Sequence, residues 1–375
     1  MKVTNVTAFL VHPTSSTGLP VLKNWLFVKV ETDEGITGWG EGFTFIDREK
    51  GAAAFVEELS RYLVGRDPFR IKEFMILAEK FAEGRGSLDV NAAVSALEQA
   101  QWDIVGKALN TPVYNLLGGA CRDKFLVYAN GWTQGAKTLD DIAKRAAHAV
   151  ERGFKAVKFY PFPFGNPVDD KTVVDKVRAV RQAVGPDIKL MIDVWRRPDP
   201  IQAVRVSRLL EEFDIYWYEE PVPSLNLDVL ASVRAQVNLP VVTGECLYTK
   251  YDFMQVLEKR AADIINPDVT SCGGILQLKE IAAMAEPYYV LMSPHNYNSP
   301  ALGLAATIQA CAVMSNFLIT EYFISFVETA EAICKEIPKF EDGHVLLPTA
   351  PGLGVEMDES AFKRYPFERF AVRSW

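Results

Sequence analysis

Three acidic side chains stand at the ends of three successive apolar runs. Asp193 ends KLMID, Glu219 ends IYWYE and Glu245 ends LPVVTGE, at equal intervals of 26 residues. A carboxylate buried among apolar residues is costly unless a counter-charge or a cation compensates it. Because three hard carboxylate oxygens that converge on one point suit Mg²⁺, this spacing predicts a site for one magnesium ion. The alternative, in which each acid caps a helix or pairs with a basic side chain, does not explain the common spacing.

The next two runs end in a carboxylate and an imidazole. Asp268 ends DIINPD and His295 ends VLMSPH. A carboxylate beside an imidazole fixes its tautomer and raises its basicity. We therefore expect the His295–Asp268 pair to act as a general base or acid near neutral pH. Among the other histidines, His148 and His344 suit surface roles, and His12 follows the first strand.

Further ionisable residues stand at the ends of two other runs. Lys158 and Tyr160 end AVKFY, and Glu321 lies in the last run, FLITEYF. A lysine that lies beside three carboxylates and a cation can hold an anionic intermediate. A protonated Glu321 could donate a hydrogen bond to the same intermediate.

Eight short β-rich runs, each followed by a polar or helical segment, must position these side chains. Repeated β-then-α units imply parallel strands with right-handed crossovers, and eight such units close a barrel. Active sites of these barrels lie at the carboxyl ends of the strands. We therefore predict an α/β fold with a (β/α)8, or modified TIM, barrel; a doubly wound open sheet is the alternative. The runs are FLVYAN, AVKFY, KLMIDV, IYWYEE, LPVVTGE, DIINPDV, VLMSPH and FLITEYF.

The N-terminal part of the chain has a different pattern. Three strand-like stretches cover residues 2–11, 25–32 and 37–41, and a long helical pattern follows over residues 52–117. Strands followed by helices indicate an α+β domain. We predict an N-terminal α+β capping domain over 1–120, the barrel with the active site over 121–325, and a C-terminal segment over 326–375 that returns to the capping domain.

Composition excludes several classes of protein. The 375 residues are 49% hydrophobic, and their scattered glycines and prolines argue against disordered and collagen-like chains. A net charge of -8 without a basic arm predicts no nucleic-acid partner. We expect a cytoplasmic protein with no membrane partner, because no run reaches the ~18 apolar residues of a membrane span and the N-terminus lacks a signal architecture. The five cysteines contain no CxxC pair and are expected to be reduced.

The motifs together resemble the enolase superfamily and, within it, the mandelate racemase / muconate lactonizing enzyme subgroup. The resemblance covers the whole chain. It implies a capped barrel, a metal site at Asp193, Glu219 and Glu245, and a catalytic dyad of His295 and Asp268. It rests on GITGWGE (35–41), ALEQAQWDIVGKALNTPVYNLLGG (96–119), IDV, YEEP, TGE, NPD, SPH, TEYF and PGLGVEMDE (351–359).

The resemblance also implies a reaction type. Members of the superfamily abstract the proton α to a carboxylate with the help of Mg²⁺, and Lys158 and Glu321 would lie beside the enediolate. Where racemases of the subgroup carry a second lysine as a base, this chain has Tyr160, and a tyrosine ordinarily has a pKa of ~10. A site with one base, His295, suits elimination of a β-hydroxyl from the same face. We therefore predict a lyase, a hydro-lyase of the acid-sugar dehydratase kind, that converts an aldonate or aldarate to a 2-keto-3-deoxy acid.

Two kinds of alternative stay open. A cycloisomerase or a racemase/epimerase would form the same enediolate, and a non-catalytic sugar-acid-binding protein would keep only the fold. We expect a small-molecule sugar-acid substrate and a homo-oligomer between a dimer and an octamer. The residues expected to contact the substrate lie in the loop after the first strand and at strand ends: His12, Lys23, Trp132, Trp195 and Arg196.

Overall fold

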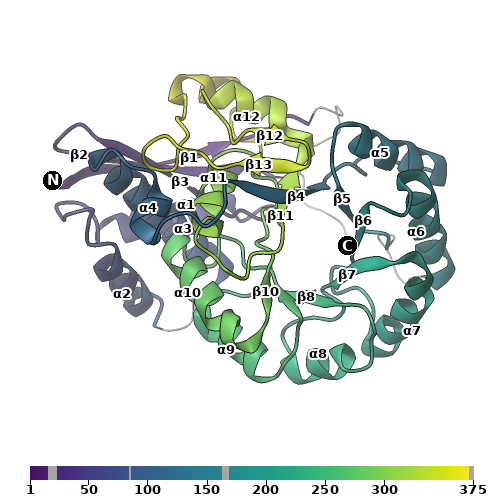
Figure 1. Ribbon diagram of the computed structural model, residues 1–375. Helices are drawn as coiled ribbons and strands as arrows, with labels where there is room; N and C mark the ends of the chain where they lie inside the picture. Colours follow the sequence, from purple (N-terminus) through teal and green to yellow (C-terminus); the bar gives the residue numbers. More distant parts are fainter. Residues whose placement is uncertain (16–22, 84–85, 163–168, 371–375) are drawn as a thin grey trace.

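The computed structural model describes residues 1–15, 23–83, 86–162 and 169–370. In this part of the chain a three-stranded sheet with a helical layer precedes a barrel of parallel strands (Figure 1). The purple and blue N-terminal elements lie to one side of the barrel, and the helices from α5 (Leu139–Glu151) to α10 (Ile275–Ala285) run around its outside (Figure 1). Among the described residues no helix has the length and apolar character needed to cross a membrane.

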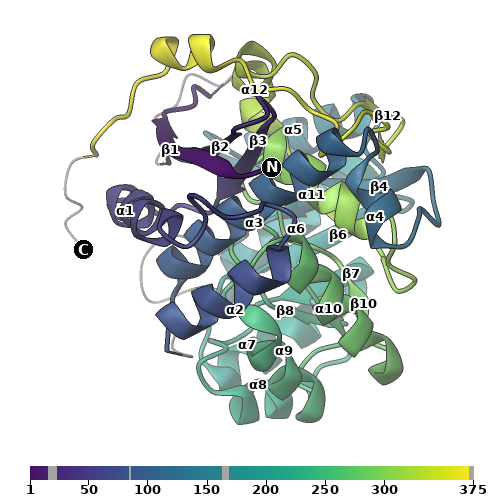
Figure 2. The ribbon, with the colours of Figure 1, turned by 90° about the vertical axis from the view of Figure 1, so that its left-hand side faces the viewer.

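The capping sheet is antiparallel and packs closely on one long helix. Its strands are β1 (Val3–Val11), β2 (Trp25–Thr32) and β3 (Thr37–Gly42), and the helices that follow are α1 (Glu49–Ser60), α2 (Ile71–Phe81), α3 (Leu88–Ala108) and α4 (Val113–Leu117). A Cβ at Gly40 would lie 1.9 Å from the carbonyl oxygen of Ala96, so only glycine lets α3 approach β3 this closely. On its other side α3 contacts the barrel helix α10 (Ile275–Ala285) (Figure 2).

Eight parallel strands follow, one in each of the eight predicted runs. They are β4 (Lys124–Asn130), β5 (Ala156–Phe159), β6 (Lys189–Asp193), β7 (Ile215–Glu219), β8 (Val241–Thr243), β9 (Ile264–Ile265), β10 (Leu291–Met292) and β11 (Thr320–Phe323). The helices between them are α5 (Leu139–Glu151), α6 (Asp170–Val184), α7 (Pro200–Leu210), α8 (Leu227–Arg234), α9 (Thr249–Glu258), α10 and α11 (Leu302–Cys311), with short 3-10 helices η1 (Glu211–Phe213) and η2 (Glu286–Tyr288).

The sheet closes on itself. Neighbouring strands from β4 to β10 pair in parallel, β11 pairs in parallel with β4, and Met292 of β10 bridges in parallel to Phe317, just before β11. The predicted (β/α)8 barrel is therefore confirmed, and the alternative of an open doubly wound sheet is wrong.

The barrel interior is filled by a small cluster of apolar side chains. These are Tyr128, Ala156, Met191, Trp217, Val242, Ile264 and Ile319, all of them buried. A larger apolar layer lies between the strands and the surrounding helices. Because successive side chains of a strand point to opposite faces, the interior residues fix which later residues of each strand face inward.

The C-terminal segment contacts both the barrel and the capping sheet. After η3 (Ile324–Phe326) and α12 (Val327–Ile333), a hairpin of β12 (Phe340–Glu341) and β13 (His344–Leu346) pairs antiparallel with the start of β4. The last 3-10 helix is η4 (Glu359–Arg364), and its Phe362 packs against the rings of Phe9, Phe27 and Trp39 at centroid distances of 5.3, 5.7 and 5.9 Å.

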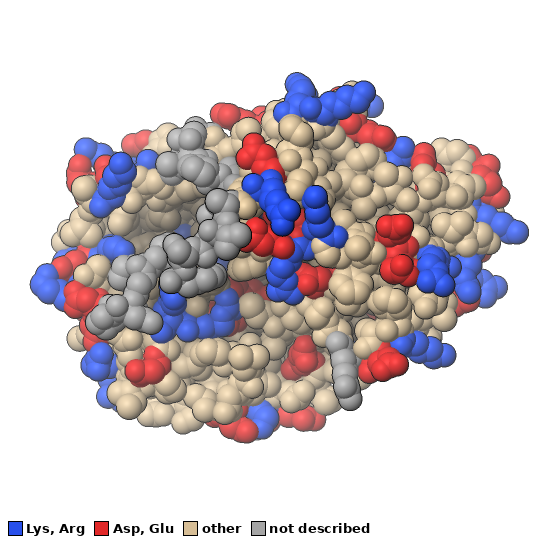
Figure 3. Space-filling model, turned by 180° about the vertical axis from the view of Figure 1, so that it is seen from behind, with Lys and Arg blue, Asp and Glu red and all other residues tan. Residues whose placement is uncertain are grey.

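Charged side chains of both signs are interspersed over the face shown in Figure 3. Some join the parts of the fold, for example Lys29 with Glu359 at 2.8 Å and Lys72 with Glu280 at 2.6 Å. Because exposed ion pairs contribute about 0–1 kcal/mol each, the apolar layers provide most of the stability.

We expect Phe362→Ala to lower the free energy of unfolding by about 3 kcal/mol, because it removes a buried ring from an aromatic cluster. Urea denaturation followed by fluorescence measures the change. Phe69→Ala is the control, since Phe69 is 43% exposed and should shift the transition little. Equal effects of the two substitutions would mean that the tail does not stabilise the capping sheet.

Candidate active site

Strand alternation brings the acidic side chains to the carboxyl end of the barrel. Met191 of β6 faces the interior, so Asp193, two residues later, faces it again where the strand ends. Trp217 and Glu219 repeat this relation on β7, and Asp193 and Glu219 are paired across the two strands. The strands themselves therefore hold two of the predicted metal ligands side by side.

The predicted triad converges. One carboxylate oxygen from each of Asp193, Glu219 and Glu245 lies within 4.8 Å of the other two. Burial and the neighbouring Glu245 raise the pKa of Asp193 to about 6, and burial raises the pKa of Glu219 to about 8. Burial also acts on Glu245, but its pKa is lowered to about 2 because His295 and Arg196 lie beside it. Carboxylates that raise one another's pKa in this way are stabilised by a shared cation.

The donor set fits a hard divalent cation. Three carboxylates can each give one oxygen and leave the remaining positions of a six-coordinate ion to water or substrate. The orientation of Glu219 is fixed by three donors: Lys158 Nζ at 2.8 Å, Asn266 Nδ2 at 3.0 Å and Trp217 Nε1 at 3.0 Å. The described residues therefore contain a carboxylate triad that could hold a metal ion.

The predicted dyad is formed as well. His295 Nδ1 lies 2.7 Å from Asp268 Oδ2, and Asp268 Oδ1 accepts from the amide and the hydroxyl of Thr270 at 2.8 and 2.5 Å. A carboxylate only accepts hydrogen bonds, so the proton on Nδ1 points to Asp268. The other ring nitrogen, Nε2, faces the triad and lies 3.3 Å from Glu245. Burial alone would lower the pKa of His295, but Glu321 and Asp268 raise it well above its ordinary value.

Lys158 and Glu321 face each other across the same site. Lys158 Nζ lies 3.5 Å from Glu321, and its pKa is raised well above the ordinary value because Glu219 and Glu321 outweigh its burial. Glu321 is expected from the sequence to donate a hydrogen bond if it is protonated. Its pKa is lowered despite its burial, because Lys158 and His295 lie beside it and it accepts from Asn130 Nδ2 at 2.5 Å. These neighbours favour the ionised form of Glu321, which accepts hydrogen bonds.

Tyr160 and Trp195 lie together near the ends of β5 and β6, with ring centroids 6.1 Å apart. The hydroxyl of Tyr160 accepts from Arg197 Nε at 3.0 Å. Burial raises the pKa of Tyr160 although Arg197 opposes the shift, so the phenol stays protonated at neutral pH. Tyr160 is thus suited to hydrogen bonding rather than to accepting a proton.

Two expected substrate contacts have other partners. The guanidinium of Arg196 lies 2.9 Å from Glu245 and 3.5 Å from Glu220, so this side chain supplies positive charge beside the triad. The indole of Trp132 donates to the carbonyl oxygen of Lys158 at 2.8 Å and lies against Phe159, in the layer outside the strands. Trp132 is therefore a packing residue.

The loop after β1 brings one cation close to the dyad. Lys23 is buried, donates to the carbonyl oxygen of Tyr297 at 3.0 Å, and lies over the rings of Phe43 and Tyr297. Burial lowers its pKa although four carboxylates oppose the shift. His12 instead lies against the C-terminal segment, with Nε2 3.5 Å from Glu368. The part of this loop over residues 16–22 lies outside the described residues.

The sequence analysis missed several neutral residues of the site. Asn130, which ends the first run, and Asn266 orient the carboxylates of Glu321 and Glu219. The ring of Tyr297 stacks on His295 at a centroid distance of 6.2 Å and an interplanar angle of 17°. An asparagine at a strand end and an aromatic residue two positions after His295 carry no charge at neutral pH, so the pattern of ionisable strand ends did not indicate them.

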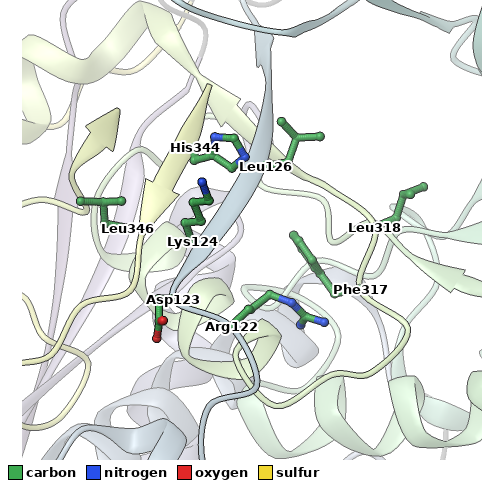
Figure 4. A pocket seen from close by; sticks show the side chains of 8 residues that line it. All are labelled: Arg122, Asp123, Lys124, Leu126, Phe317, Leu318, His344 and Leu346. Atoms are coloured by element: carbon green, nitrogen blue, oxygen red, sulfur yellow. The ribbon is translucent and has the colours of Figure 1, made fainter. Parts of the chain in front are cut away.

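A second hollow lies at the opposite, amino end of the barrel. It has a volume of about 680 Å³ and is lined by residues at the starts of β4 and β11 and on β13 (Figure 4). Its lining residues are Arg122, Asp123, Lys124, Leu126, Phe317, Leu318, His344 and Leu346. None of the converging acids belongs to it, so we place the candidate active site at the carboxyl end.

The fold and the site define a class of proteins, the capped (β/α)8 barrels in which a carboxylate triad faces a His–Asp dyad. Residues 8–118 match the model of the mandelate racemase / muconate lactonizing enzyme N-terminal domain, and residues 141–361 match that of the enolase C-terminal domain-like family. The chain belongs to the mandelate racemase / muconate lactonizing enzyme family of the enolase superfamily. The predicted family is therefore confirmed.

Known proteins resemble this chain over nearly its whole length. It is 35% identical to D-galactonate dehydratase of Pectobacterium atrosepticum, over 96% of this chain and 93% of that protein. The structure of 3,6-anhydro-D-galactonate cycloisomerase from Zobellia galactanivorans matches with a TM-score of 0.88 and 28% identity, covering 98% of this chain and 100% of that one. An enolase from the environmental genome shotgun sequencing of the Sargasso Sea matches with a TM-score of 0.91 and 28% identity, covering 98% and 97%. The dehydratase name is that of a hydro-lyase, the class predicted from the sequence.

We expect Mg²⁺ to bind more tightly as the pH rises from 6 to above 8. Asp193 and Glu219, with pKa values of about 6 and 8 in the metal-free chain, must lose their protons when the ion binds. Isothermal titration calorimetry in buffers of different ionisation enthalpy measures both the affinity and the protons released.

The matched variants are Glu219→Gln, which removes one ligand charge, and Glu286→Gln, an exposed glutamate in η2. We expect the first to weaken Mg²⁺ binding at least about tenfold and the second to leave it unchanged. Tight, pH-independent binding in the Glu219→Gln variant would place the ion elsewhere.

Proposed function

We propose that the chain dehydrates a sugar acid to a 2-keto-3-deoxy acid, with Mg²⁺ held by Asp193, Glu219 and Glu245. The observation that carries the proposal is the orientation of His295. Its Nδ1 is held by Asp268 at 2.7 Å, while its Nε2 points toward the triad. A base so oriented reaches the proton α to a carboxylate that lies at the triad.

The residues of the chain have separate tasks in this reaction. His295 Nε2 takes the α-proton, and Asp268 stabilises the imidazolium that forms. Bound Mg²⁺ would supply positive charge to the substrate carboxylate as negative charge accumulates there. The ammonium of Lys158 lies beside the same ligands and adds a second positive charge. Glu321 lies 3.5 Å from Lys158 Nζ and 3.6 Å from His295 Nε2, so it keeps Lys158 charged and stabilises the imidazolium once His295 has taken the proton.

The second half of the reaction uses the same histidine. The imidazolium of His295 gives its proton to the β-hydroxyl, the C–O bond breaks, and water leaves from the face that lost the α-proton. The resulting enol then becomes the 2-keto-3-deoxy acid. Because Tyr160 stays protonated, His295 is the base that the described residues of the site offer, which favours this syn elimination over racemisation or epimerisation.

A cycloisomerase is the second candidate, and one observation favours it. The match to the structure of 3,6-anhydro-D-galactonate cycloisomerase extends over 100% of that protein's chain. That reaction would form the same enediolate, but a ring oxygen would leave or attack in place of a hydroxyl group. Products distinguish the two reactions, whereas the metal, base and acid do not.

The reaction is tested by a screen of aldonates and aldarates with Mg²⁺, beginning with D-galactonate because of the named relative. We expect a 2-keto product, detected by ultraviolet absorbance after reaction with semicarbazide. In His295→Asn we expect kcat to fall by about 10²- to 10⁴-fold, as loss of a general base predicts.

His344→Asn is the matched control, because His344 lies on β13 at the other end of the barrel. It should turn over the substrate at the wild-type rate. Turnover that survives unchanged in His295→Asn would contradict the assigned base. Keto products from anhydro sugars alone would identify the cycloisomerase.

We expect Tyr160→Phe to keep kcat within about tenfold of the wild type, because a protonated phenol contributes a hydrogen bond and not a base. Steady-state kinetics on the substrate found in the screen measures this, and KM should carry most of the change. A loss as large as that of His295→Asn would mean that Tyr160 acts on the second face of the substrate.

A further inference from the structure

The dyad lies beyond the ends of two very short strands. Strand β9 ends at Ile265 and β10 ends at Met292, so Asp268 and His295 each come three residues after the last strand residue. Asp268 and His295 form an isolated parallel β-bridge, with a hydrogen bond from the amide of His295 to the carbonyl oxygen of Pro267 at 3.2 Å. The dyad is therefore paired beyond the ends of the continuous strands, where contacts from other parts of the fold can also act on it.

A buried glutamine of the capping domain contacts the first of these loops. Gln99 of α3 has no exposed surface, and its Nε2 donates to the carbonyl oxygens of Glu41 at 2.9 Å and Val269 at 3.2 Å. Its Oε1 accepts from the amide of Glu41 at 3.1 Å. Gln99 thus fixes β3 to the residue that follows Asp268. The amide of Phe43 adds a bond to the carbonyl oxygen of Thr270 at 2.8 Å.

The residue that Gln99 binds on β3 contacts the second loop. Glu41 is 3% exposed, and its Oε2 accepts from Ser299 Oγ at 2.5 Å and from the amide of Gly303 at 2.9 Å. Ser299 lies in the same loop as His295, and Gly303 is in the first turn of α11. Gln99 and Glu41 together therefore connect the loop of Asp268 to the loop of His295 through the capping domain.

We propose that Gln99 and Glu41 are positioning residues that set the distance between Asp268 and His295. Gln99 acts through the carbonyl oxygen of Val269, next to Asp268, and Glu41 acts through the hydroxyl of Ser299 and the amide of Gly303, further along the segment that follows His295. A shift of the capping domain relative to the barrel would displace the two loops and change the distance between Asp268 and His295. The kinetic part of this inference rests on the proposed function, because it assumes that His295 is the base.

The first test needs no substrate. In Gln99→Met, the downfield proton resonance of His295 Nδ1–H should be lost or shifted, because its hydrogen bond to Asp268 lengthens. The resonance is assigned by its absence in His295→Asn; the chain has four histidines, so the spectrum is simple. Gln101→Met is the matched control: Gln101 is equally buried on α3, but its Nε2 bonds only within the helix, to the carbonyl oxygen of Leu97 at 3.4 Å.

The second test uses the substrate found in the screen. In Gln99→Met we expect kcat to fall by about 10- to 100-fold with KM little changed, as misplacement of a catalytic group predicts. Gln101→Met should match the wild type. Glu41→Gln, which keeps an acceptor oxygen, should lose less activity than Glu41→Ala.

The outcomes separate the inference from the proposed function. Circular dichroism confirms folding, and if Gln99→Met fails to fold, Glu41→Gln and Glu41→Ala give the same comparison. A folded variant that is less stable but keeps the His295 resonance and kcat would overturn the positioning role. A wild type that turns over no sugar acid would contradict the proposed function, while the resonance would still decide the positioning role.

Discussion

Burial of charge at one end of the barrel is the constraint on which the rest of the structure depends. Ionised groups lose much hydration when they leave water, so each must face a partner of opposite sign. Lys158 lies between Glu219 and Glu321, Arg196 lies beside Glu245, and His295 lies between Asp268 and the triad. Because positive and negative side chains alternate in this way, parallel strands can end in acidic residues. Among the three metal-ligand candidates, negative charge exceeds positive charge.

The same alternation explains why so much of the site could be predicted from the sequence. A strand has a period of two, so an inward-facing Met191 or Trp217 places Asp193 or Glu219 inward as well. The repeating βα unit then puts the strand ends side by side. These are local rules that a linear chain displays directly, and they were sufficient for the barrel, the triad and the dyad.

Other features of the site depend on partners that are remote in the sequence. Gln99 meets Val269 across 170 positions, and no local pattern distinguishes it from Gln101 on the same helix. The ionisation of Glu321 depends on Lys158, His295 and Asn130, which come from three other strand ends. Arg196 was expected at the substrate because it follows a strand, yet its position next to Glu245 follows from a left-handed backbone at φ 62°. Contacts of this kind depend on how loops and domains pack against each other. The local sequence pattern carries no information about that packing.

Phe362 also affects the order in which the molecule can be completed during synthesis. The rings of Phe9, Phe27 and Trp39, made early, pack on a side chain made more than three hundred residues later. Until that segment leaves the ribosome, this face of the first sheet has no native cover, and the start of β4 lacks its partner β13. Nascent chains with exposed apolar faces and open strand edges are the species that aggregate or recruit chaperones. The maturation of the N-terminal sheet is thereby tied to translation of nearly the whole chain.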